Sequence, residues 1–181
     1  MARKIFFVTG LSGIGKTTLI QDFIASTPHW KRVSGGDLLL QGTHASRDSL
    51  KNVSLEDKLH QQNVIVTRFN GFLDLNQENI LFDGHVTMHV SDGNLFITPY
   101  EVLKNLHVTA VVVITGQPQT IFLRRKNDSL RLREIEDVET IQHRQNLTLT
   151  ICRDYASQLN IPMLELWEPT PEQFKASILR L

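Results

Sequence analysis

The sequence is poor in the features that mark secreted, membrane-spanning and nucleic-acid-binding proteins. Its 181 residues include one cysteine, Cys152, so that no internal disulfide can form, which agrees with a reducing, cytoplasmic compartment. No stretch approaches the roughly 20 apolar residues of a membrane span. The N-terminal apolar run is short and lacks a cleavage site, so we expect no signal peptide. The 19 basic and 19 acidic residues balance, which gives no sign of a nucleic acid or membrane partner.

The most specific pattern lies near the N-terminus. An apolar run at residues 5–9 leads directly into GLSGIGKT at residues 10–17, with the spacing G-x-x-x-x-G-K-T. Strand, glycine loop and helix in this order are typical of a phosphate-binding P-loop, whose backbone N–H groups converge on one spot. Lys16 is predicted to reach the terminal phosphates of ATP, and the Thr17 hydroxyl to hold Mg²⁺. The residues expected to bind ATP are Gly13, Ile14, Gly15, Lys16, Thr17 and Thr18.

Apolar strands alternate with helices along the chain, which is long enough for one domain. The alternation predicts an α/β fold, a three-layer α/β/α sandwich with a five-stranded parallel sheet of the P-loop NTPase type. Ligands of such sheets bind at the carboxyl ends of the strands. Strands are expected over 4–9, 32–34, 79–82, 109–115 and 161–166. Helices are expected over 16–25, 54–75, 99–106, 117–126, 138–159 and 170–181.

Two local expectations concern the region after the second strand. Gly35-Gly36-Asp37 is expected to break the chain before a helix that starts at Leu38. Ser54 is expected to cap the helix that runs to about Leu75. The apolar positions near one face of that helix are Leu55, Leu59, Val66, Phe69 and Leu73.

Asp83 ends an apolar strand, which is the setting of a Walker-B carboxylate. Phosphoryl transfer needs a metal ion that bridges phosphate oxygens, so Thr17 and Asp83 are predicted to hold Mg²⁺ together, directly or through water. The alternative is an aspartate that caps the following turn. His85 is a candidate to orient a phosphate or a carboxylate, or else fills the mouth of the sheet. The other six histidines show no metal-ligand spacing.

Basic residues gather in two places. Five of the 19 Lys and Arg residues fall within positions 124–133, and we predict that Arg131 and Arg133 act with Lys16 in catalysis by contacting the transferring phosphoryl group. The alternative is a solvated, charged helix end. Arg47, beside Asp48, is predicted to meet the phosphate of an acceptor, and a surface ion pair is nearly as good an explanation.

Taken together, these motifs resemble the archaeal-type adenylate kinases, a family of P-loop nucleoside-monophosphate kinases. The stretches that resemble that family are VTGLSGIGKTT at 8–18, GDL at 36–38, RD at 47–48, DGH at 83–85 and the R-R-x-x-D-x-x-R-x-R pattern at 124–133. The resemblance implies transfer of the ATP γ-phosphoryl to a nucleoside monophosphate, with AMP as first choice and Mg²⁺ required. It also implies substrate contacts at Asp37, Arg47 and His85.

We expect the whole chain, residues 1–181, to form one domain. Within it, the resemblance implies a monophosphate-binding segment at about 36–75 and a mobile lid at about 124–137. The chain departs from the pattern where Lys51 replaces arginine and Gly84 replaces threonine, and over 86–98. Two other functions stay open: a slow ATPase that acts as a switch in a larger assembly, and a kinase for a small non-nucleotide acceptor with Asp37 as base. Nucleotide substrates are the expected partners, and the protein is expected to be a monomer or a small homo-oligomer.

Overall fold

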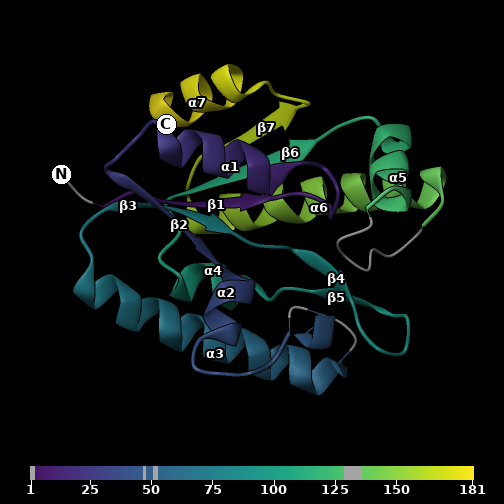
Figure 1. Ribbon diagram of the computed structural model, residues 1–181, viewed down its shortest axis with the longest axis horizontal. Coiled ribbons are helices and arrows are strands. Elements are labelled where there is room, and N and C mark those ends of the chain that lie inside the picture. The colour runs from purple at the N-terminus through teal and green to yellow at the C-terminus, as the bar shows by residue number, and fades with distance from the viewer. Residues whose placement is uncertain (1–2, 47, 51–52, 129–135) are drawn as a thin grey trace.

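The computed structural model describes residues 3–46, 48–50, 53–128 and 136–181. Its centre is a five-stranded parallel sheet in the order β2-β3-β1-β6-β7, which confirms the predicted α/β class (Figure 1). Strands β1 and β6 are buried along their whole length, as continuous apolar runs in a parallel sheet should be. The strands of this sheet are β1 (Ile5–Thr9), β2 (Trp30–Ser34), β3 (Asn79–Asp83), β6 (Ala110–Thr115) and β7 (Met163–Trp167).

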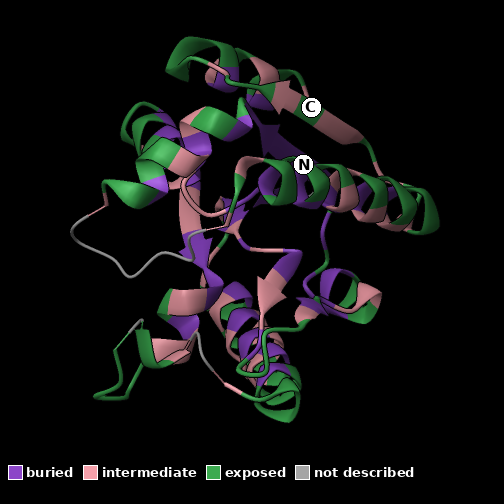
Figure 2. Cartoon of the chain, turned by 90° about the vertical axis from the view of Figure 1, so that its right-hand side faces the viewer, coloured by how far each residue is buried: buried purple, intermediate pink, exposed green. Residues whose placement is uncertain are grey.

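Helices cover both faces of the sheet and complete three layers (Figure 1). Helices α1 and α7 pack together on one face, where the rings of Phe23 and Phe174 meet edge to face. Helices α3, α4 and α6 bury their apolar sides against the other face, and Figure 2 shows their outer sides exposed. The helices are α1 (Lys16–Ala25), α2 (Gly35–Leu40), α3 (Leu55–Leu75), α4 (Tyr100–Asn105), α5 (Pro118–Lys126), α6 (Val138–Leu159) and α7 (Pro171–Arg180), with a 3-10 turn at Asp48–Leu50.

A short antiparallel hairpin stands apart from the main sheet. Strands β4 (Thr87–His89) and β5 (Leu95–Ile97) pair across a turn at Asp92-Gly93, where Gly93 takes a left-handed backbone conformation with a φ of 84°. These strands were not among those expected from the sequence, because three residues on each side are too few for a period to show.

Two of the local expectations are wrong. Helix α2 begins at Gly35, because the Ser34 hydroxyl accepts a hydrogen bond from the Asp37 backbone N–H at 3.1 Å and caps the helix there. In α3, Leu55 and Leu59 are 56% and 43% exposed. The first turns of α3 instead face the segment that precedes this helix in the chain. The residues that α3 buries are Lys58, Gln62, Ile65, Phe69 and Leu73.

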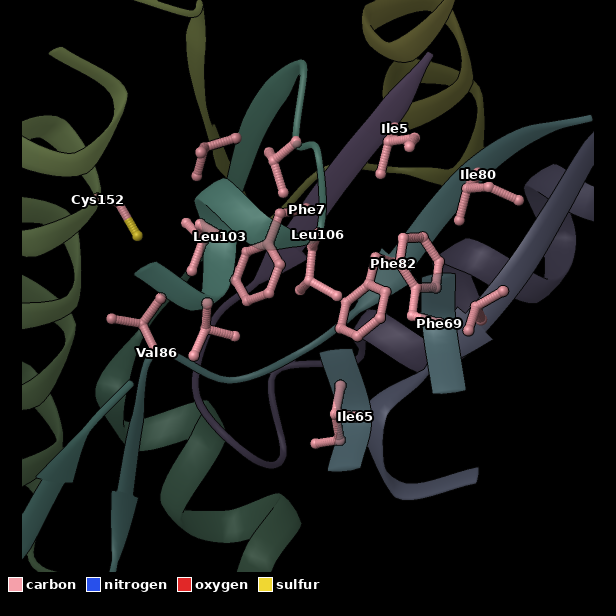
Figure 3. Packing of buried hydrophobic residues seen from close by; sticks show 14 of the residues in the cluster. Ile5, Phe7, Ile65, Phe69, Ile80, Phe82, Val86, Leu103, Leu106 and Cys152 are labelled. Atoms are coloured by element: carbon pink, nitrogen blue, oxygen red, sulfur yellow. The ribbon is translucent and has the colours of Figure 1, made fainter. Parts of the chain in front are cut away.

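The core around strands β1 and β3 contains several aromatic side chains. The rings of Phe7 and Phe82 stack with centroids 5.7 Å apart, and Phe69 of α3 meets Phe82 edge to face at 5.1 Å (Figure 3). A Cβ atom at Gly84 would lie 2.6 Å from the Phe7 ring, closer than real contacts allow. The Phe7 ring therefore occupies the space that a side chain at position 84 would need, which explains why glycine stands where the resembling family has threonine.

Candidate active site

The glycine loop joins β1 to α1 at the carboxyl edge of the sheet. Gly10 approaches β6 so closely that a Cβ atom there would lie 2.3 Å from the Ile114 carbonyl oxygen. Gly15, the residue before the first turn of α1, has a φ of 106°, which side chains rarely permit. These constraints shape the loop so that α1 begins at Lys16 and directs its N-terminal N–H groups toward the loop.

Lys16 is held inside this loop. Its side chain is buried, and the ammonium Nζ donates a hydrogen bond to the Gly10 carbonyl at 2.8 Å. The ammonium charge is therefore held next to the Gly10 carbonyl, at the start of the glycine loop. Thr17 and Thr18 follow in the first turn of α1.

Asp83 lies beside the loop because β3 is the direct neighbour of β1, with Asp83 in register with Val8. Arg32 of β2 donates two hydrogen bonds to Asp83 Oδ2, from Nη2 at 2.8 Å and from Nε at 3.2 Å. Burial raises the pKa of the Asp83 carboxyl, but the Lys16 ammonium and the Arg32 guanidinium outweigh it and hold that pKa below its usual range. Asp83 is therefore ionised at neutral pH.

His85 shares the Gly10 carbonyl with Lys16, since its Nδ1 lies 3.2 Å from that oxygen. The positive charge of Lys16 and burial lower the pKa of His85 to about 3. The imidazole is therefore neutral near pH 7, and because a carbonyl can only accept, Nδ1 carries the proton and Nε2 is left as an acceptor.

One guanidinium joins the two predicted halves of the site. Asp37, half exposed in the first turn of α2, accepts hydrogen bonds at Oδ2 from Ser34 Oγ at 2.8 Å and from Arg32 Nη1 at 3.1 Å. Arg32 thus bridges Asp37 and Asp83. Arg32 was not among the residues predicted from the sequence, although a cation two residues before the end of a strand was a usable signal once β2 and β3 were known to be neighbours.

Two arginines from the basic stretch at 124–133 contact the glycine loop. Arg124 Nη1 donates to the Ile14 carbonyl at 2.9 Å, and Arg125 Nε donates to the Ser12 carbonyl at 2.8 Å. Both arginines belong to the last turn of α5. The Ser12 and Ile14 carbonyls therefore have side-chain partners from α5, while the Ile14 N–H donates to the Leu11 carbonyl at 3.3 Å within the loop. This supporting role was not foreseen.

Three predicted site residues, Arg47, Arg131 and Arg133, lie outside the described residues. Within the described ranges no group of three or more His, Cys, Asp or Glu side chains is placed to hold a metal ion. The magnesium ligands expected from the sequence, Thr17 and Asp83, stay a prediction. No helix in the described part of the chain has the length and apolarity that crossing a bilayer requires.

Comparison with known proteins extends these observations. A family model described as an AAA domain matches residues 9–142. An adenylate kinase from Pyrococcus abyssi is 30% identical over 162 residues, which cover 86% of this chain and 82% of that protein. An adenylate kinase from Thermoplasma acidophilum is 25% identical over 181 residues, with 96% of each protein covered.

Solved structures share the fold. A shikimate kinase from Bacteroides thetaiotaomicron matches with a TM-score of 0.60 at 14% identity, over 99% of this chain and 96% of that one. A sugar kinase from Janibacter sp. HTCC2649 matches with the same TM-score and identity, over 99% and 94%. At this identity the likeness concerns the fold alone. The similarity in sequence is the stronger result, and because it extends over most of the chain at 25–30% identity, the protein belongs to the archaeal-type adenylate kinase family of ATP-dependent phosphotransferases.

Proposed function

We propose that the protein transfers the γ-phosphoryl group of ATP to a nucleoside monophosphate, with AMP as the first-choice acceptor. One observation carries the proposal within the structure: Arg32 bridges Asp83, beside the glycine loop, and Asp37, at the start of α2. This bridge supports a donor site beside the glycine loop and an acceptor site near Asp37, at the edge of the sheet where ligands of such folds bind. The names of the adenylate kinases that resemble this chain support the choice of acceptor.

In this proposal the loop amides, from Gly13 to Thr18, and the Lys16 ammonium hold the β- and γ-phosphates of ATP. Lys16 is already buried over the loop, so little reorganisation is needed when the nucleotide binds. Replacement of Lys16 by alanine should lower the rate of phosphoryl transfer by on the order of 100-fold or more.

The residues present fit a magnesium ion. Mg²⁺ prefers hard oxygen ligands and keeps several waters, so a protein supplies one or two side chains and the phosphates supply the rest. The Thr17 hydroxyl and the ionised Asp83 carboxylate are such a pair, and both Arg32 contacts go to Asp83 Oδ2. When bound, the ion would supply positive charge that offsets the negative charge of the phosphates.

The acceptor half is assigned to Asp37, Arg47 and His85, within a monophosphate-binding segment at about 36–75. Arg131 and Arg133, in a lid at about 124–137, would contact the transferring group. No general base is needed, because an acceptor phosphate oxygen is already ionised. The protein then contributes positioning, charge stabilisation and the exclusion of water, which would otherwise accept the phosphoryl group.

A panel of acceptors tests the proposal. Purified protein is mixed with ATP and one monophosphate at a time (AMP, CMP, GMP or UMP), with Mg²⁺ or with EDTA, and the diphosphates are quantified by chromatography. We expect AMP to be consumed fastest of the four monophosphates, with two ADP formed for each ATP used, and this turnover to need Mg²⁺. Absence of a diphosphate product from every monophosphate would overturn the proposal, and a different preferred monophosphate would correct only the acceptor.

A further inference from the structure

A cluster of charged side chains lies just outside the glycine loop. Glu136, which precedes α6, accepts a hydrogen bond at Oε2 from Arg125 Nη1 at 2.5 Å. Its other oxygen, Oε1, accepts from Arg144 Nη1 at 2.6 Å and lies 3.0 Å from His89 Nε2. One carboxylate therefore connects α5, α6 and the β4–β5 hairpin.

The cluster is buried. The side chains of Arg125, Arg144 and Glu136 are 2%, 7% and 10% exposed. Buried guanidinium groups need a fixed negative partner, because desolvation of an uncompensated charge costs several kcal/mol. The arginines and His89 in turn lower the pKa of Glu136 to about 2, although burial acts to raise it, so the carboxylate stays ionised at neutral pH.

Arg125 connects Glu136 to the glycine loop. While Nη1 contacts Glu136, Nε donates to the Ser12 carbonyl at 2.8 Å. The stem of the same side chain lies against the loop, since a Cβ atom at Gly13 would be 3.0 Å from Arg125 Cγ. The planar guanidinium therefore transmits the position of Glu136 to a loop carbonyl 124 residues away in sequence.

We propose that Glu136 is a positioning residue for ATP: through Arg125 it holds the Ser12 carbonyl turned outward, and so keeps the amides of the glycine loop directed at the phosphates. Glu136 itself touches no nucleotide. A neutral side chain at position 136 holds the Arg125 guanidinium less firmly, and the loop then loses a charge-assisted support on its outer side. ATP affinity should fall, while the affinity for the acceptor monophosphate should not.

The test is ATP binding by calorimetry, without any acceptor, so that its outcome does not depend on which monophosphate the enzyme uses. Glu136→Gln and Arg125→Met are each expected to weaken ATP binding by on the order of tenfold, the lower range for residues that orient ligand-binding groups. Because both act through the same contact, the double variant should lose little more than either single variant. Glu136→Asp, which keeps the charge, should recover part of the affinity.

Glu139→Gln is the matched control, since it removes the same charge from an exposed position three residues away and should bind ATP as the native protein does. Thermal melts establish that each variant is folded. If Glu136→Gln does not fold, Arg125→Lys serves instead, because it keeps the charge but loses the Nε contact to Ser12. Native ATP affinity in a folded Glu136→Gln or Arg125→Lys variant, or full additivity in the double variant, would overturn the proposal.

Discussion

At the scale of single residues, Gly84 shows how core packing determines what can stand beside the site. Its Cα faces the Phe7 ring, with room for hydrogen only. Gly84→Thr should therefore lower the free energy of unfolding by about 1–3 kcal/mol, the usual cost of overpacking. Denaturant titration measures this cost.

The double variant Phe7→Leu with Gly84→Thr isolates the cause. If the Phe7 ring is the obstacle, a smaller side chain at position 7 should make Gly84→Thr cheaper in that background than in the native one. An equal cost in both backgrounds would show that the obstacle lies elsewhere.

Glu136 makes the stability depend on pH. Its pKa is about 2 in the folded protein against an ordinary value of 4.5, so its contribution is complete above about pH 4.5 and is lost as the pH falls toward 2. The loss should be on the order of 2–3 kcal/mol.

The variant Glu136→Gln tests this assignment. Although less stable at pH 7, it should lose less stability between about pH 4.5 and pH 2 than the native protein does, as measured by urea titrations at several pH values. An acid profile for Glu136→Gln that runs parallel to the native one would contradict the assignment, and Glu139→Gln is the control.

At the scale of elements, the bounds of α3 follow from its own sequence, but its buried face depends on how the helix packs. The bounds and the Ser54 cap were predicted correctly, because Ser54 accepts from the Asp57 N–H as a capping serine does. The buried face was predicted wrongly at the first turns. Lys58 turns inward and its Nζ donates to the Leu50 carbonyl at 2.7 Å, so that Leu55 and Leu59 face outward. A contact with another segment is not visible in the helix's own pattern.

The corrected face of α3 gives a prediction. Ile65 is 7% exposed and packs in the core with Phe82, whereas Leu59 is 43% exposed (Figure 3). Ile65→Ala should cost about 2–5 kcal/mol in the free energy of unfolding, and Leu59→Ala less than about 1 kcal/mol. Chemical denaturation of the two variants compares them directly. Equal costs would contradict this buried face and favour the face predicted from the sequence.

The α5 arginines show a second limit of sequence reasoning. The R-R-x-x-D-x-x-R-x-R pattern drew attention to the right segment, but the pattern does not say which arginines face the loop. Arg124 and Arg125 support loop carbonyls more than 100 residues earlier in the chain. Contacts of that separation depend on how α5 packs beside the glycine loop, which no local spacing determines.

At the scale of the whole molecule, the local structure of the glycine loop could be predicted and the Arg32 bridge between Asp37 and Asp83 could not. The P-loop is a continuous motif, so its strand, turn and helix are encoded in neighbouring residues from Ile5 to Ala25. The Arg32 bridge requires the sheet order β2-β3-β1, which brings residues 32, 37 and 83 together. Strand order follows from packing of the whole chain and is not written in any one segment.

The central claim is that the phosphoryl group passes from ATP to a nucleoside monophosphate, and the fate of a labelled γ-phosphoryl group tests it most directly. Protein in excess is mixed with γ-labelled ATP, Mg²⁺ and AMP for a single turnover, and the labelled products are separated. We predict that the label appears in ADP and that Lys16→Ala slows this transfer by on the order of 100-fold or more. Label found only in inorganic phosphate, with AMP and with every other monophosphate, would contradict the account and identify a slow ATPase instead.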